Sequence, residues 1–220
     1  CLVYIILKFD ILKLQKEDFE PDVSMMQRLL SIGVPMGLQF SITAIGTIIV
    51  QSAINVFGAD YIAGYAAAGK LQNMVNTIFI AFGATIATFV GQNRGAGRLD
   101  RVRQGVKDTQ IMILIAAAFS FLIIHFFAGK LTLIFVDSSK TVVIDAANQY
   151  FKTVSWCYPF LGSIFLYRNA LQGMGYGLVP MLGGVFELLA RGAVVVLVLH
   201  LGGGFVQTCL SDPAAWISAL

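Results

Sequence analysis

The sequence predicts an all-α membrane protein, a polytopic helix bundle, from its composition and the placement of its charges. Of the 220 residues, 57% are hydrophobic and only 12% are charged, whereas an ordinary soluble domain is about 25% charged. No ionisable side chain occurs between Arg28 and Asp60, or between Lys70 and Arg94. Each interval exceeds the roughly 20 apolar residues that a helix needs to cross a bilayer core. The runs also lack the alternation of apolar and polar residues that is typical of membrane strands.

The apolar runs predict a series of membrane spans. Residues 1–9 are typical of the end of a helix, and residues 10–30 form a polar segment that we expect to be a cytoplasmic linker. Fuller spans are expected at residues 31–57, 63–91, 106–129, 143–171 and 176–200, followed by a truncated span at 212–220. Because the first and last residues fall inside apolar runs, we interpret the sequence as a fragment truncated within helices at both ends.

Basic residues predict the orientation of these spans. They gather before the first full span, at Lys8, Lys13, Lys16 and Arg28, and after the second, at Arg94, Arg98, Arg101, Arg103 and Lys107. Arg168 flanks the loop after the fourth span, and the intervening loops are poorer in Lys and Arg. Since Lys and Arg collect on the cytoplasmic side of a membrane, the first full span should run from inside to outside. We therefore expect a multi-pass protein of the cell membrane, plasma or inner.

Several classes of function are disfavoured by the composition. The net charge is only +3, and no basic tract with interleaved aromatic residues is present, so a nucleic-acid partner is not expected. The three cysteines have neither disulfide nor metal-ligand spacing, which predicts no metal site. We find no cluster of His, Asp or Glu that would serve catalysis, so we expect neither an enzyme nor a bound cofactor. The glycines of residues 173–177 do not match a dinucleotide-binding motif and predict a turn.

Polar residues lie along one stripe of the first full span. They recur at intervals of four, at Gln39, Thr43, Thr47, Gln51 and Asn55, and the second span adds Asn73 and Asn76. Residues at this spacing share a helix face, and polar groups cannot face lipid without a cost. The stripe predicts either hydrogen bonds between helices, worth about 0.6 kcal/mol each, or the wall of a water-filled substrate cavity.

The charged pair Glu187 and Arg191 is predicted to lie inside the membrane. Glu187 follows Tyr176 by eleven residues, which is about 16 Å along a helix, so it should lie near the centre of the bilayer. Arg191 is four residues further on and can meet it on one helix face. Such a pair is either a structural ion pair or a site that couples protons or substrate. By contrast, Asp145 lies near the end of its span, where we expect only a boundary role.

Pro159 falls inside the fourth expected span. A proline within a helix removes one backbone hydrogen bond and clashes with the preceding turn. We therefore predict a kink in this span at Pro159.

Four segments together resemble the multidrug and toxic compound extrusion (MATE) family of transporters. They are GQNRGAGR at residues 91–98, ALQGMG at 170–175 with Pro180 and the later Glu187-Leu188-x-x-Arg191, IGVP at 32–35, and SDPAAW at 211–216. The resemblance implies two six-helix lobes about a central cavity. Residues 31–220 would be the C-terminal lobe, residues 10–30 the linker between lobes and residues 1–9 the end of the sixth helix, and the missing N-terminal lobe would be a partner.

The resemblance also implies an activity. Family members are antiporters that export organic cations and drugs in exchange for sodium or protons. The sodium-coupled branch carries acids at the positions that match Thr43 and Leu161, neither of which is acidic here. The chain is therefore closer to the DinF-like, proton-linked branch, and we expect H⁺ rather than Na⁺ as coupling ion. The alternatives are a lipid-linked oligosaccharide flippase of the same superfamily and an integral membrane subunit without transport activity.

Overall fold

The computed structural model describes residue 8 and residues 20–220, and this part of the chain is helical with no strand. Its elements are α2 (Val23–Ile54), η3 (Asn55–Phe57), α3 (Ala59–Gly95), α4 (Leu99–Thr132), α5 (Thr141–Val154), η4 (Ser155–Cys157), α6 (Tyr158–Gly173), α7 (Leu178–His200), α8 (Phe205–Cys209) and α9 (Ser211–Ser218). Four stretches are long and apolar enough to cross a membrane: Val23–Phe57, Ala59–Gly95, Leu99–Thr132 and Leu178–His200. The predicted all-α membrane fold is confirmed. The expected helix end at residues 1–9 and the first part of the linker lie outside the described residues, apart from Lys8.

The long helices extend beyond the apolar runs that predict them. Helix α2 begins at Val23, where Asp22 caps it by accepting a hydrogen bond from the Met25 backbone N–H at 3.0 Å. Residues 23–30 of the expected linker are therefore helical. Helices α3 and α4 are separated only by residues 96–98, so most of the predicted basic loop consists of their ends. Hydropathy detects only the lipid-facing middle of a helix, and polar turns can continue it into the interface.

The span expected at residues 143–171 is two helices rather than one kinked helix. Helix α5 ends at Val154, a short 3₁₀ segment follows, and α6 begins at Tyr158. Pro159 lies in the first turn of α6, where the missing N–H has no helical acceptor to lose. The predicted interior kink is therefore replaced by a break that precedes the proline.

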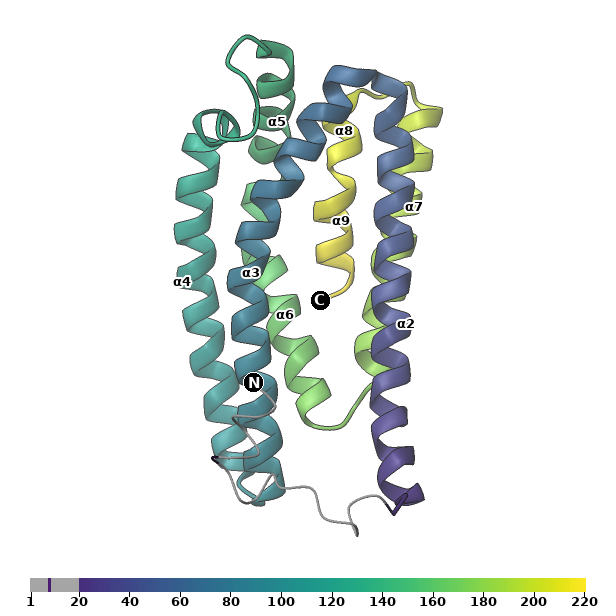
Figure 1. Ribbon diagram of the computed structural model, residues 1–220, viewed down its shortest axis with the longest axis vertical. Helices are drawn as coiled ribbons and strands as arrows, with labels where there is room; N and C mark the ends of the chain where they lie inside the picture. Colours follow the sequence, from purple (N-terminus) through teal and green to yellow (C-terminus); the bar gives the residue numbers. More distant parts are fainter. Residues whose placement is uncertain (1–7, 9–19) are drawn as a thin grey trace.

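The helices form two layers (Figure 1). In one layer α2 packs along α7, and α7 packs along α9; in the other, α3 packs against α4, α5 and α6. The turns α3–α4 and α6–α7 lie at the end of the molecule where α2 begins, and the α2–α3 and α4–α5 connections lie at the opposite end (Figure 1). Large apolar side chains such as Phe40, Ile115, Phe119 and Val196 are exposed on the outside, as expected for helices surrounded by hydrocarbon.

Close helix contacts in the α3–α6 layer depend on glycine. A Cβ on Gly64 would lie 2.6 Å from the Cβ of Ala146 on α5, and one on Gly173 would lie 2.4 Å from the Ala87 carbonyl oxygen. Real Cβ atoms do not tolerate such separations, so α3 approaches its neighbours only because these positions carry no side chain. Small residues serve the same purpose at interfaces between membrane helices in general.

Candidate functional site

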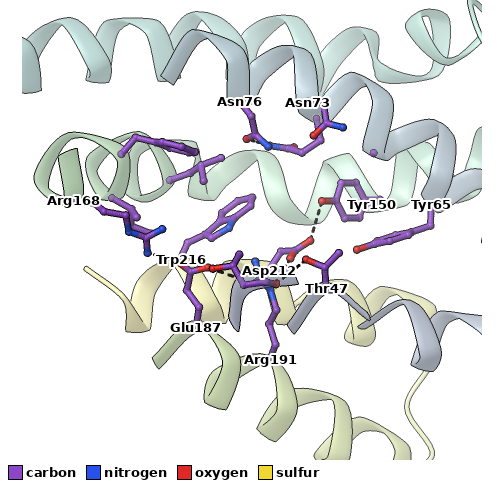
Figure 2. Close-up of a pocket in the computed structure, with 16 residues that line it drawn as sticks. Thr47, Tyr65, Asn73, Asn76, Tyr150, Arg168, Glu187, Arg191, Asp212 and Trp216 are labelled. Atoms are coloured by element: carbon purple, nitrogen blue, oxygen red, sulfur yellow. Dashed lines mark hydrogen bonds and ion pairs between the residues drawn. The ribbon is translucent and has the colours of Figure 1, made fainter. Parts of the chain in front are cut away.

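A cavity of about 330 Å³ lies between the two layers. Helices α2, α3, α5, α6, α7 and α9 all contribute to its wall (Figure 2). Its polar and aromatic lining comprises Thr43, Thr47, Tyr65, Gln72, Asn73, Asn76, Tyr150, Phe165, Arg168, Glu187, Arg191, Asp212 and Trp216. This volume is within the range of small-molecule sites, roughly 300–1,000 Å³.

The predicted polar stripe meets the cavity over part of its length. Thr43 and Thr47 on α2 line it, as do Asn73 and Asn76 on α3. Gln39 is buried beside it; with its amide oxygen facing Arg168, it accepts hydrogen bonds from Nε at 3.1 Å and Nη1 at 3.0 Å.

Gln51 and Asn55 lie outside the lining and bond to each other, with Gln51 Nε2 donating to Asn55 Oδ1 at 3.3 Å. Residues four apart on a helix are displaced by about 40° each time, so the stripe has turned by about 160° between Gln39 and Asn55. Of the five residues of the stripe, Thr43 and Thr47 therefore line this cavity, whereas Gln39, Gln51 and Asn55 lie outside its lining.

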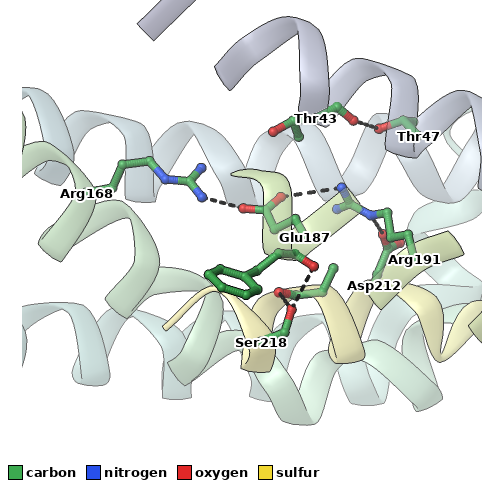
Figure 3. A network of polar contacts seen from close by, with 9 residues as sticks. Thr43, Thr47, Arg168, Glu187, Arg191, Asp212 and Ser218 are labelled. Atoms are coloured by element: carbon green, nitrogen blue, oxygen red, sulfur yellow. Dashed lines mark hydrogen bonds and ion pairs between the residues drawn. The ribbon is translucent and has the colours of Figure 1, made fainter. Parts of the chain in front are cut away.

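The predicted pair of Glu187 and Arg191 is part of a larger charged network (Figure 3). Glu187 Oε2 accepts from Arg191 Nη1 at 3.4 Å, and Glu187 Oε1 accepts from Arg168 Nη2. Arg191 Nε also donates to Asp212 Oδ1 at 3.3 Å. Tyr150 Oη completes the network by donating to Asp212 Oδ2 at 2.9 Å. Two guanidinium groups and two carboxylates thus balance to zero charge.

The network connects the two layers across the cavity. Arg168 is on α6, whereas its partner Glu187 is on α7. Tyr150 is on α5, whereas its partner Asp212 is on α9. An isolated charge in an apolar interior costs far more than one paired and hydrogen-bonded. The pairing therefore favours the arrangement in which the layers face each other.

Arg168 and Asp212 were not predicted as site residues. Arg168 was expected beside a cytoplasmic loop, but it lies inside α6 and its side chain is only 15% exposed. A basic residue five positions before a turn can lie either at the cytoplasmic interface or inside the helix bundle, and hydropathy does not distinguish these two positions. Asp212 had a usable signal, because it is an acid in the first turn of an otherwise apolar segment. Its partner Tyr150 is 62 residues away, and one sequence carries no information about that contact.

Within residue 8 and residues 20–220, no group of three or more His, Cys, Asp or Glu could hold a metal ion. Cys157 and Cys209 are free thiols. The cavity wall presents hydrogen-bonding groups, ion pairs and aromatic surfaces.

Comparison with known proteins finds one matching family model and several related sequences. The MatE family model matches residues 35–202. The probable multidrug resistance protein YpnP of Bacillus subtilis is 25% identical over 147 residues, which are 67% of this chain and 33% of that protein. YoeA of the same organism, also a probable multidrug resistance protein, is 22% identical over 193 residues, 88% of this chain and 41% of the relative. The FAD transporter of Shewanella oneidensis is 22% identical over 145 residues, 66% of this chain and 32% of that protein. The chain thus spans well under half the length of these relatives.

Solved structures show the same fold. The crystal structure of a MATE protein in complex with MaL6 superposes with a TM-score of 0.89 at 14% identity, over 99% of this chain and 50% of that one. A MOP superfamily transporter from Pyrococcus furiosus superposes with a TM-score of 0.88, also at 14% identity and with 99% and 50% coverage. The fold described above is therefore that of half of a MATE structure. Because the MatE family model also matches residues 35–202, which are most of this chain, the chain belongs to the MatE family.

Proposed function

We propose that this chain is the C-terminal lobe of a secondary transporter that exports small amphiphilic solutes by alternating access. The observation that carries the proposal is the cavity between the layers, which has a paired four-charge network on its wall. Charged groups inside a membrane are costly and are typical of substrate and ion pathways. The names of relatives, which include a multidrug export protein of Staphylococcus haemolyticus, support the same activity.

Four of the predicted polar residues are proposed to contact the solute. Thr43 and Thr47 would do so from α2, and Asn73 and Asn76 from α3, since all four lie on the cavity wall. Glu187 and Arg191 would act mainly on one another and on their network partners, because both side chains are buried and bonded. The missing N-terminal lobe would supply the opposite wall.

Antiport with protons rather than sodium is the second part of the proposal. Thr43 and Leu161, at the positions where sodium-coupled relatives are expected to carry acids, have no charge. In the described part of the chain, both carboxylates on the cavity wall are bound by Arg or Tyr side chains. Neither carboxylate is therefore free to coordinate Na⁺, which prefers such oxygen ligands.

Efflux from cells that express the full-length protein tests both parts. We expect these cells to retain less dye than cells with an empty vector, over a panel of cationic, neutral and anionic dyes. Replacing external sodium with choline should leave efflux mostly intact, and collapsing the proton gradient should abolish it. Equal retention of every dye in both cell types would contradict the transport proposal. Loss of efflux in choline alone would contradict proton coupling. The cationic members of the panel address the sequence-based prediction of organic-cation substrates.

A further inference from the structure

In the described part of the chain, the cavity wall contains two acidic residues, Glu187 and Asp212. Both carboxylates are bound by neighbouring side chains, but the two sets of neighbours differ. A carboxylate that is surrounded by positive charge stays ionised, whereas one with less positive charge nearby takes up a proton more readily. The contacts of each residue therefore indicate which of the two can exchange a proton.

Glu187 is enclosed by positive charge. Its two oxygens accept from different guanidinium groups, Oε1 from Arg168 and Oε2 from Arg191. A proton on Glu187 would leave Arg168 without a carboxylate partner among the described residues. Because an unpaired charge in an apolar interior is costly, Glu187 is the carboxylate that should remain ionised.

Asp212 is bound less tightly to positive charge. Its Oδ1 accepts from Arg191 Nε at 3.3 Å, and its Oδ2 accepts from the neutral hydroxyl of Tyr150. Arg191 also donates to Glu187, at 3.4 Å, and Figure 3 shows it between the two carboxylates. Charge-assisted N–H···O bonds are usually about 2.7–2.9 Å long, so Arg191 is shared between two acids at the limit of bonding distance. A proton on Asp212 still leaves Arg191 with Glu187 as its partner.

Few other titratable or charged groups face Asp212. They are Arg191 and Glu187 on α7, Arg168 on α6, Tyr150 on α5, Tyr65 on α3 and Cys209 on α8. Among the described residues, α2 and η4 add no titratable group to the cavity wall. Phenol and thiol groups ordinarily lose a proton only above about pH 8, so the two arginines and Glu187 are the neighbours that carry charge at neutral pH.

A proton on Asp212 changes the charge of the cavity wall. With both carboxylates ionised, they and the two guanidinium groups sum to zero. With Asp212 protonated the sum becomes +1, in an interior where charges are screened far less than in water. A cationic solute in the cavity and this proton therefore oppose each other's binding, and the effect is reciprocal. Such mutual exclusion of proton and solute is what antiport requires.

We propose that Asp212 is the residue of this lobe that carries the exchanged proton. The inference rests on the proposed function and assigns a residue to its coupling step. When the cavity is open to the outside, a proton from external water binds the Asp212 carboxylate as the solute leaves, and Arg191 closes on Glu187. When the cavity is open to the cytoplasm, the entering solute displaces this proton into cytoplasmic water, and Arg191 again bridges the two carboxylates.

Binding of ethidium to the purified full-length protein tests the proposal. Ethidium is a permanent cation, so its own charge is the same in mildly acidic and mildly alkaline solution. Its Kd is measured by fluorescence anisotropy under both conditions. In the unaltered protein, acidification should raise the Kd by about fivefold or more, since linked sites typically change each other's affinity by at least this factor.

Two variants fix the charge of the wall in opposite ways. Asp212→Asn leaves the network at +1, so the Kd should be high under both conditions. Asp212→Asn combined with Arg191→Gln returns the sum to zero and keeps the Arg168–Glu187 pair, so the Kd should be low under both. The double variant also avoids the uncompensated charge that would destabilise the single variant.

Asp145→Asn is the matched control, because Asp145 is exposed and lies outside the cavity lining. It should keep the pH response of the unaltered protein. A purely structural Asp212 would change the affinity for ethidium without removing that response. The inference is overturned if ethidium binding by the double variant weakens on acidification as much as in the unaltered protein. It is also overturned if the unaltered protein shows no pH response or does not bind ethidium. The proposed function fails separately, when efflux by the unaltered protein is absent or persists after the proton gradient is collapsed.

Discussion

At the scale of single residues, Arg191 holds the charged network together. It lies between two carboxylates, with Nη1 at 3.4 Å from Glu187 and Nε at 3.3 Å from Asp212. Its side chain is 7% exposed, against 15% for Arg168. Its contact with Glu187 was predictable because it joins residues four apart on one helix. The Arg191–Asp212 and Arg168–Glu187 bonds join different helices, and neither hydropathy nor spacing along the sequence can identify them.

Glu187→Gln should be far more damaging than Asp145→Asn. Glu187 is 4% exposed and bound by two guanidinium groups, so its neutralisation leaves an uncompensated positive charge in the interior. We expect a loss on the order of 3 kcal/mol in the free energy of unfolding. Asp145 is exposed on α5, and its substitution should change that quantity by less than about 0.5 kcal/mol. Unfolding of the full-length protein in mixed micelles, with increasing sodium dodecyl sulfate, measures both values.

A compensating variant separates charge balance from loss of shape. Adding Arg168→Gln to Glu187→Gln removes one charge of each sign and leaves the Arg191–Asp212 pair intact. The double variant should therefore recover part of the stability that Glu187→Gln loses. If both single carboxylate variants were tolerated equally, the network would have no stabilising role.

At the scale of helices, the apolar middle of each span was predictable and its ends were not. The break at η4 was also missed, because residues 155–157 are as apolar as their neighbours and contain no strong helix breaker. Hydropathy reports how apolar a segment is. A change from α-helical to 3₁₀ geometry does not alter the hydropathy of residues 155–157, so hydropathy cannot detect it. Contacts between helices depend on where small residues fall, and that pattern appears only when the helices are paired.

Gly64→Ala should push α3 away from α5. The added methyl would lie 2.6 Å from the Ala146 Cβ and 2.8 Å from the Val143 carbonyl oxygen, which is backbone and cannot rotate away. Overpacking of this kind costs about 1–3 kcal/mol. Gly69→Ala on the same helix is the control, since its methyl would meet nothing within 4 Å, and alanine favours a helix by about 0.5–1 kcal/mol over glycine. Thermal melting of the two purified variants should shift in opposite directions, and a shared direction would refute this role for Gly64.

At the scale of the whole molecule, the alternation of turns between two ends was predictable from the basic residues, but the two layers were not. The α2–α3, α3–α4, α4–α5 and α6–α7 connections each reverse the chain, so these connections determine which helix ends lie together (Figure 1). By contrast, the pairing of α2 with α7 joins helices far apart in sequence. The cavity is a product of that pairing, because its wall takes residues from both layers. Polar residues on one helix can therefore suggest a cavity but cannot indicate its other side.

The orientation of the molecule in the membrane gives a final prediction. At one end of the molecule, the α3–α4 turn and the adjoining helix ends carry Arg94, Arg98, Arg101 and Arg103, whereas exposed Ser138 lies in the α4–α5 connection at the other end. Since basic residues are retained in the cytoplasm, Ser138→Cys should react with a membrane-impermeant maleimide in intact cells. Arg101→Cys should react only after permeabilisation. Both variants are made in a background without other cysteines, and labelling of both after permeabilisation is the control for reactivity. Labelling of Arg101→Cys in intact cells would mean that the lobe is inserted the other way, with the basic turn outside.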